Sequence, residues 1–181
     1  MSQTTEGRRQ LVLVTTGGTI EKTYDEATGA LVNRVTLVRR MLAEIRLEDT
    51  DVEVVEVMHK DSLEMDAEDR AEILAAVVDA LARAGAERVD GVVVLHGTDT
   101  LTDTGEVLAA GLADLRVPVV LTGAIRPFEM RRSDALQNLT EAIFATGTLQ
   151  PGVYVVAHGR ALPLPGARKD RERQTFVSAP R

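Results

Sequence analysis

The regular alternation of short apolar runs with helical patterns is the feature that most restricts how this chain can fold. Runs rich in valine and leucine, typical of buried strands, occupy 10–16, 51–57, 91–95, 117–123 and 152–159. Between them, apolar residues recur at helical spacing in 36–49, 65–85, 102–115 and 133–147. Strands that alternate with helices predict an α/β fold: a mostly parallel sheet with helices on both faces, in three layers.

Polar residues and a glycine mark the expected ends of two of these helices. Thr36 and Asp66 stand where an N-cap is needed, and Gly85 stands just past the last helical position of 65–85. We therefore expect helices that begin after Thr36 and Asp66.

The composition restricts the class of protein. A chain of 181 residues with 44% hydrophobic residues has room for one domain of ordinary size, and we expect residues 1–181 to form it. The net charge of −7 and the aromatic content of 3% argue against a nucleic-acid partner. No apolar run approaches the roughly 20 residues that span a bilayer, and residues 1–10 lack the apolar stretch of a secretory signal. We therefore expect a cytoplasmic protein with no membrane partner.

The segment 160–181 differs from the rest of the chain because it is rich in proline and charged residues. It shows no long periodic pattern. Composition alone leaves two alternatives open: a solvated tail, or an ordered segment that folds over the functional site.

Short polar residues and glycines gather where the expected strands end. The segments are TTGGTIEKT (15–23), MHKDS (58–62), HGTDT (96–100) and TGAIRP (122–127). In an open parallel sheet, ligands bind beyond the carboxyl ends of the strands. We therefore expect these segments to line one pocket.

The first of these segments does not match the common phosphate-binding motifs. It lacks the spacing of GxxxxGK[ST] and of GxGxxG, and the chain lacks the GxSxG of serine hydrolases. Gly17 and Gly18 allow a tight turn and a close approach of the backbone to a ligand, and they leave Thr19 with little steric cover. Two interpretations of Thr19 stay open on this pattern: a turn residue or a nucleophile.

A threonine hydroxyl is a weak nucleophile and needs a base within reach. The sequence offers Asp99, Lys169 and the histidines His59, His96 and His158. No three of these residues show the spacing of a metal site, so we expect neither a metal nor another cofactor. Solvated or hydrogen-bonded side chains are the simpler interpretation of the histidines.

Several motifs together resemble those of the bacterial-type L-asparaginase family. They are TGGTI (16–20), HGTDT (96–100), TGAIRP (122–127) and SDALQNL (133–139), in this order. The resemblance runs from about Leu11 to Lys169 and covers only the N-terminal domain of that family. It implies an α/β fold and an amidohydrolase that converts L-asparagine or a related small amide to the acid and ammonia.

The resemblance also implies catalytic roles. Thr19 matches the family's nucleophilic threonine, and Thr98, Asp99 and Lys169 match its proton relay. Tyr24 matches the tyrosine of the mobile loop that closes over the substrate. If Lys169 has this role, the residues before it fold back over the site.

Substrate-binding roles are implied for a second group of residues. Ser62 matches the serine that binds the α-carboxylate of the substrate, and Asp99 would also hold its α-ammonium. Gly18 lets the substrate approach the backbone. The N–H groups near Thr98 and Ala124 would stabilise the oxyanion, a contribution of roughly 3 kcal/mol for each donor.

The chain departs from the family pattern. Family enzymes carry a second, C-terminal domain, and residues from a neighbouring subunit's second domain complete the amino-acid pocket. Leu63 stands where a polar residue is usual, and Ala135 stands where glycine is common. Two alternatives therefore stay open: a non-catalytic module that binds acidic amino acids, and a subunit of a larger amidotransferase. We also expect a dimer or tetramer, because a domain that usually packs on another exposes apolar surface when alone.

Overall fold

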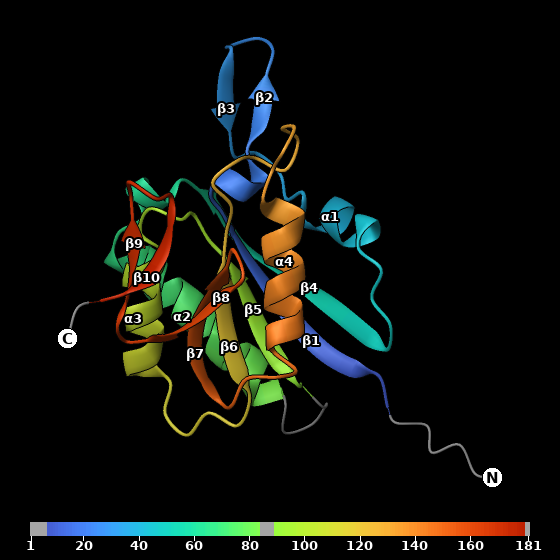
Figure 1. Cartoon of the computed structure of the whole chain (residues 1–181), viewed down its shortest axis with the longest axis vertical. Helices are drawn as coiled ribbons and strands as arrows, with labels where there is room; N and C mark the ends of the chain where they lie inside the picture. The colour runs from blue at the N-terminus through green and yellow to red at the C-terminus, as the bar shows by residue number, and fades with distance from the viewer. Residues whose placement is uncertain (1–6, 84–88, 180–181) are drawn as a thin grey trace.

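A mostly parallel sheet forms the centre of the molecule. The computed structural model describes residues 7–83 and 89–179, and its six-stranded sheet has the order β4-β1-β5-β6-β7-β8 (Figure 1). The parallel strands are β1 (Arg9–Gly17), β4 (Thr50–Lys60), β5 (Gly91–Leu95), β6 (Pro118–Thr122) and β7 (Gly152–Ala157). β8 (Arg160–Leu164) lies antiparallel to β7 at one edge. The predicted α/β class is confirmed.

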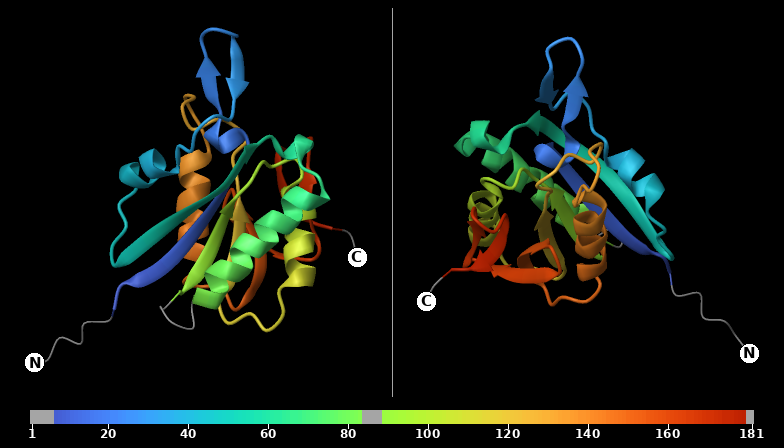
Figure 2. Two further views of the ribbon diagram at one scale, coloured as in Figure 1. Left: turned by 180° about the vertical axis from the view of Figure 1, so that it is seen from behind. Right: turned by 45° about the horizontal axis from the view of Figure 1, so that its top comes forward.

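Helices cover both faces of this sheet (Figure 2). They are α1 (Val38–Glu44), α2 (Ala67–Arg83), α3 (Leu101–Gly111) and α4 (Ala135–Ala145). Alternate side chains of β1 point to opposite faces, so Leu11 and Leu13 pack with α1 and α4, whereas Val12 and Val14 pack with α2 and α3. A strand covered on both sides is apolar at every position, which explains why this run does not alternate. No helix among the described residues has the length and apolar character needed to cross a membrane.

Two helices are shorter than their patterns predict. α1 ends at Glu44 instead of residue 49, because Ile45 already has an extended backbone and packs against the core from that conformation. α3 ends at Gly111 instead of residue 115, and Leu112 and Leu115 reach the core from the irregular chain that follows. Apolar residues in extended backbone had extended the apparent helical pattern in both cases.

Both side chains that were expected to cap a helix accept backbone amides at its start. Asp66 caps α2 as predicted, because its Oδ1 accepts two backbone amides of the first turn at 2.9 and 3.0 Å. Thr36 precedes Leu37, the residue before α1, and its hydroxyl oxygen accepts the amide of Val38, the first residue of α1, at 3.2 Å. The Thr36 hydroxyl also donates to the carboxylate of Glu21. Gly85 lies outside the described residues.

A small hairpin projects from the carboxyl edge of the sheet (Figure 1). Its strands are β2 (Thr23–Asp25) and β3 (Ala30–Val32), which follow a 3-10 turn at Thr19–Glu21. An ion pair between Arg34 and Asp25 ties β2 to the chain that leaves β3. These strands were not predicted from the sequence.

Most of residues 160–178 lie in three strands, so the alternative of a solvated tail is wrong. After β8, the strands β9 (Ala167–Asp170) and β10 (Thr175–Ser178) form an antiparallel hairpin. Leu164 and Phe176 are 7% and 2% exposed and belong to the core on the α2–α3 side. Two buried apolar side chains therefore hold this charged segment against the sheet. That residues 1–181 form a single domain stays a prediction.

Candidate active site

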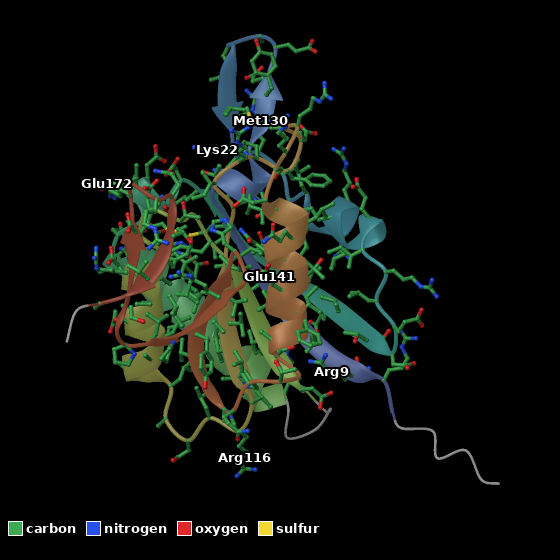
Figure 3. The ribbon with its side chains drawn as sticks, viewed as in Figure 1. Arg9, Lys22, Arg116, Met130, Glu141 and Glu172 are labelled. Carbon is green, nitrogen blue, oxygen red and sulfur yellow. The ribbon has the colours of Figure 1, made fainter. Side chains whose placement is uncertain are left out.

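The candidate site lies at the carboxyl edge of the parallel strands. In Figure 3, the labelled Lys22, just after the turn that follows β1, and Glu172, between β9 and β10, lie at the same end of the molecule. Arg116, which precedes β6, lies at the opposite end. Segments far apart in the sequence therefore reach one edge of the sheet.

The loops after β1, β5 and β6 meet at this edge through their backbones. A Cβ atom on Gly18 would lie 2.3 Å from the nitrogen of Gly97, and one on Gly123 would lie 2.1 Å from the carbonyl oxygen of His96. Side chains cannot occupy such short gaps, and Gly18 also has a φ of 77° that favours glycine. The glycines thus set how closely the loops approach.

Thr98, Asp99 and Lys169 form a hydrogen-bonded cluster between two of these segments. The Nζ of Lys169 lies 2.8 Å from Oγ1 of Thr98 and 3.0 Å from Oδ1 of Asp99. Thr98 is 5% exposed and the side chain of Lys169 is 9% exposed, so water screens their contact only weakly. The structure brings together these three residues, for which the family resemblance implies a relay.

The register of the β9–β10 hairpin explains why Lys169 points inward. Lys169 stands opposite Phe176, and Ala167 lies two residues along the same strand, so the three side chains share one face. Phe176 and Ala167 are both buried. Because a slip of one residue would exchange the two faces, the burial of Phe176 also fixes the direction of Lys169.

Thr19 begins the 3-10 turn after β1 and has different surroundings. Its side chain is half-buried, and its hydroxyl makes no hydrogen bond within residues 7–83 and 89–179. The backbone contact of Gly18 with Gly97 places its turn against the loop that carries Thr98. Thr19 is therefore presented at the edge without a base of its own.

A buried carboxylate holds this turn from beneath. Glu21 is 1% exposed, although it follows Thr19 by only two positions. Its oxygens accept two hydroxyls and two backbone amides, those of Thr15, Thr36, Gly17 and Leu37. Glu21 was not predicted as a site residue, and a single glutamate in a turn gives no sequence signal of burial.

A family model described as the N-terminal domain of asparaginase matches residues 10–179 of this chain. The chain belongs to the asparaginase family. It is 34% identical over 148 residues to the L-asparaginase of Thermococcus kodakarensis, which covers 81% of this chain and 43% of that protein. It is 36% identical over 145 residues to a glutamyl-tRNA(Gln) amidotransferase subunit of Thermoplasma acidophilum, which covers 79% of this chain and 34% of that protein.

Solved asparaginase structures share this fold over most of the chain. The thermostable L-asparaginase from Thermococcus kodakarensis superposes with a TM-score of 0.81 at 28% identity, over 93% of this chain and 51% of that chain. The probable cytoplasmic L-asparaginase from Campylobacter jejuni gives 0.76 at 27% identity, over 94% and 51%. This chain of the asparaginase family therefore spans about half the length of these relatives.

The histidine of the loop that carries Thr98 and Asp99 has a structural position in this asparaginase-family chain. The ring of His96 lies between the Gly97 carbonyl at 2.9 Å and the Thr104 hydroxyl at 2.8 Å. A carbonyl only accepts, so Nδ1 of His96 donates to it and Nε2 accepts from Thr104. Burial lowers the pKa of His96 to about 4, and the ring is therefore neutral at pH 7.

The other histidines take exposed or hydrogen-bonded positions. His59 is exposed, and its Nε2 lies 3.8 Å from the carboxylate of Glu56. His158 approaches Asp134 at 2.8 Å. Burial raises the pKa of Asp134, but the Ile125 amide, His158 and the Arg126 amide outweigh it, so the pKa lies below its usual range. Across the described ranges, no group of three or more His, Asp or Glu residues is placed to hold a metal ion.

The residues expected to bind substrate are distributed unequally. Ser62 is 1% exposed, and a Cβ on Gly97 would lie 2.5 Å from its Oγ. Ala124 is fully buried behind the same edge. Tyr24 is 61% exposed on the projecting hairpin, and Leu63 is 66% exposed. The structure thus brings Ser62 and Gly18 to the Thr98 loop, and it leaves Tyr24 on the hairpin in solvent.

Arg171 is a site neighbour that was not predicted from the sequence. Its Nη1 lies 2.9 Å from Oδ1 of Asp99, the same oxygen that contacts Lys169. The segment RKDRER (168–173) has the composition of a solvated charged run, so it gives no signal that Arg171 differs from its neighbours.

Proposed function

We propose that this chain is an amidohydrolase that converts small amides such as L-asparagine to the acid and ammonia. The contact that supports this most directly is that of Lys169 Nζ with Thr98 Oγ1, at 2.8 Å and with little exposure to water. An amine and a hydroxyl in this arrangement are positioned for proton transfer. A loop that only connects a strand to a helix would not need it.

In the proposed mechanism, Thr19 is the nucleophile. Its proton relay consists of Thr98, Asp99 and Lys169. The Thr19 hydroxyl has no competing partner in the described chain, so it is available to a substrate. In this proposal its proton passes through the Thr98 hydroxyl to Nζ of Lys169, while its oxygen bonds to the amide carbon. Asp99 holds the amine in position throughout.

The remaining steps use the same groups. Backbone N–H groups near Thr98 and Ala124 would stabilise the negative charge on the amide oxygen, by roughly 3 kcal/mol for each donor. The Lys169 ammonium returns the proton to the amide nitrogen as the carbon–nitrogen bond breaks, and ammonia leaves. Water then hydrolyses the acyl ester with the same relay as base.

We propose that Asp99 and three further residues recognise the substrate. Asp99 is 28% exposed and carries the charge that an α-ammonium needs. Ser62 and Gly18 lie against Gly97, next to Thr98, where they would contact the substrate. Tyr24 would close over the site if the β2–β3 hairpin moves.

Ammonia release from L-asparagine, L-glutamine and simple amides tests the proposal. We expect turnover by the wild type, and a loss of about 10³-fold for Thr19→Ala and for Thr98→Ala. Thr140→Ala, on the exposed face of α4, is the matched control and should retain full activity. Mass spectrometry of quenched reactions should find the acyl group on Thr19.

An acyl group on Thr98 would exchange the roles of the two threonines. If wild-type protein releases no more ammonia than Thr98→Ala on every amide, the enzymatic function is wrong. Binding of L-aspartate without turnover would then support the alternative of a non-catalytic module.

A second candidate is the glutaminase half of an amidotransferase, because curated relatives of similar identity are named as subunits of a glutamyl-tRNA(Gln) amidotransferase. The same relay would then release ammonia from glutamine for a partner chain. A preference for L-glutamine together with a stoichiometric partner in purifications from the native cell would favour this candidate. A preference for L-asparagine by the isolated chain would exclude it.

We also propose that the chain self-associates and acts in the cytoplasm. Large apolar side chains such as Phe144, Leu63 and Val35 are 68%, 66% and 57% exposed in a single copy. A domain that packs on a second domain in its family also exposes in a single copy the apolar surface that it would bury there, and such a surface favours contacts between copies. Light scattering that gives the mass of one chain at all concentrations would contradict this.

A further inference from the structure

Asp99 is shared by two basic side chains with very different surroundings. Its Oδ1 contacts Lys169 Nζ at 3.0 Å and Arg171 Nη1 at 2.9 Å. The side chain of Lys169 is 9% exposed, whereas that of Arg171 is 66% exposed. The lysine contact is enclosed, and the arginine contact faces solvent. An ion pair so exposed contributes little energy, so Arg171 can leave Asp99 at small cost.

The backbone beneath Arg171 is fixed even though its guanidinium is exposed. The carbonyl of Arg171 accepts the side-chain amide of Gln174, and the Asp170 carboxylate accepts the Arg173 amide at 3.0 Å. A hollow of about 360 Å³ lies beside this turn and is lined by residues 168–172. The backbone that carries the guanidinium is therefore held in place, and the guanidinium has open space into which it can turn.

A free amino-acid amide brings two charges to this edge. Its ammonium requires an anion, and Asp99 Oδ1 already attracts cations. Its carboxylate requires a donor, which the hydrocarbon side chain of Leu63 does not supply, and the buried Ser62 supplies one hydroxyl at most. Arg171 offers a permanently charged planar fork that matches a carboxylate with two parallel hydrogen bonds.

We propose that Arg171 selects substrates with an α-carboxylate by exchanging partners at Asp99. In the free protein the guanidinium of Arg171 pairs with the carboxylate of Asp99. When substrate binds, its ammonium takes that place and Arg171 turns to the carboxylate. Arg171 is then a specificity-determining residue, and the inference rests on the proposed function because it identifies zwitterionic amino-acid amides as the substrates.

Two ligands separate this role from simple support of Asp99. L-Aspartate has no amide to cleave, and 3-aminopropanamide keeps the ammonium and the amide but has no carboxylate. We expect calorimetry to show that Arg171→Ala weakens the binding of L-aspartate by roughly 10- to 100-fold. Binding of 3-aminopropanamide should be unchanged or tighter, because Asp99 loses a competing cation. Arg173→Ala, on the same turn, is the matched control and should change neither.

The conservative variant and the thermal midpoint keep the test decisive. Arg171→Lys should restore part of the L-aspartate affinity, and both variants should unfold at the wild-type temperature. Equal weakening of both ligands, or no change for L-aspartate, overturns the proposal, as does a wild type that does not bind L-aspartate. If L-aspartate binds through Arg171 but no amide is hydrolysed, the proposed function fails and this assignment stands.

Discussion

The two threonines at the edge of the sheet lie in neighbouring loops and yet have opposite surroundings. Thr98 is nearly buried and contacts Lys169 at 2.8 Å. Thr19 is half-buried, its hydroxyl has no hydrogen-bond partner within the described residues, and its turn is held by Glu21. One side of the site carries the proposed base and the other carries an available hydroxyl, so neither loop can perform the proposed chemistry alone.

The largest loss of unfolding free energy should come from disrupting the backbone contact between Gly18 and Gly97, which joins the two loops. Gly18→Ala would place a methyl group 2.3 Å from the Gly97 backbone, at a positive φ, and we expect a loss of more than about 4 kcal/mol in unfolding free energy. Gly29→Ala is the control, because φ is also positive there but the nearest atom lies at 3.9 Å. It should cost only about 1 kcal/mol. Urea unfolding measures both, and equal losses would mean that the loops do not touch.

The next effect tests whether the base belongs to one side only. Lys169→Met should reduce kcat by about 10³-fold while the Thr98 hydroxyl remains. Lys22→Met removes the lysine near Thr19, which pairs with Asp61, and should change kcat less than about threefold. Similar losses in the two variants would show that the two sides are equivalent.

The unfolding free energy should depend on pH because of His96, which lies buried two residues before Thr98. The pKa of His96 is about 4 in the folded chain and 6.5 as its ordinary value, so only the unfolded chain binds a proton between these values. Unfolding free energy should therefore fall by about 3 kcal/mol between pH 6.5 and 4. His96→Gln should flatten this slope, which urea titrations at several pH values would measure. An unchanged slope would assign the acid sensitivity to other groups.

The smallest effect concerns the anchor of the Thr19 turn. Glu21→Gln turns an amide N–H₂ toward donors, and we expect a loss of about 2 kcal/mol in unfolding free energy, with a lower kcat/KM. Glu26→Gln, exposed on the projecting hairpin, should lie within about 0.5 kcal/mol of wild type. Full stability of Glu21→Gln would mean that the turn is held by its glycines alone.

The sequence predicted the sheet better than it predicted the site. Apolar runs such as 91–95 and 117–123 indicate buried strands because both of their faces need apolar side chains. Helix ends were less certain, since Ile45 and Leu112 continue an apolar pattern in backbone that is no longer helical. Periodicity reports burial, and burial continues past the last helical hydrogen bond.

Site residues depend on contacts that no local pattern contains. The sequence offered Lys169 only as one of several possible bases, the family resemblance selected it, and its direction depends on Phe176 across a hairpin. Glu21 is buried because Thr36 and Leu37 return to it from a later segment. Arg171 stands in a charged run in which neighbouring arginines are solvated. Their environments are made by the fold, so their sequence neighbours reveal little.

The position of Lys169 on the β9–β10 hairpin has a consequence for biosynthesis. Every strand of the parallel sheet precedes this hairpin in the chain, so the ribosome delivers them all before the amine emerges. A nascent polypeptide can thus pair all of its parallel strands while it still lacks Lys169, the proposed proton acceptor, and Phe176, which completes the core. The growing chain would therefore lack the proposed hydrolytic activity until the hairpin leaves the exit tunnel of the ribosome.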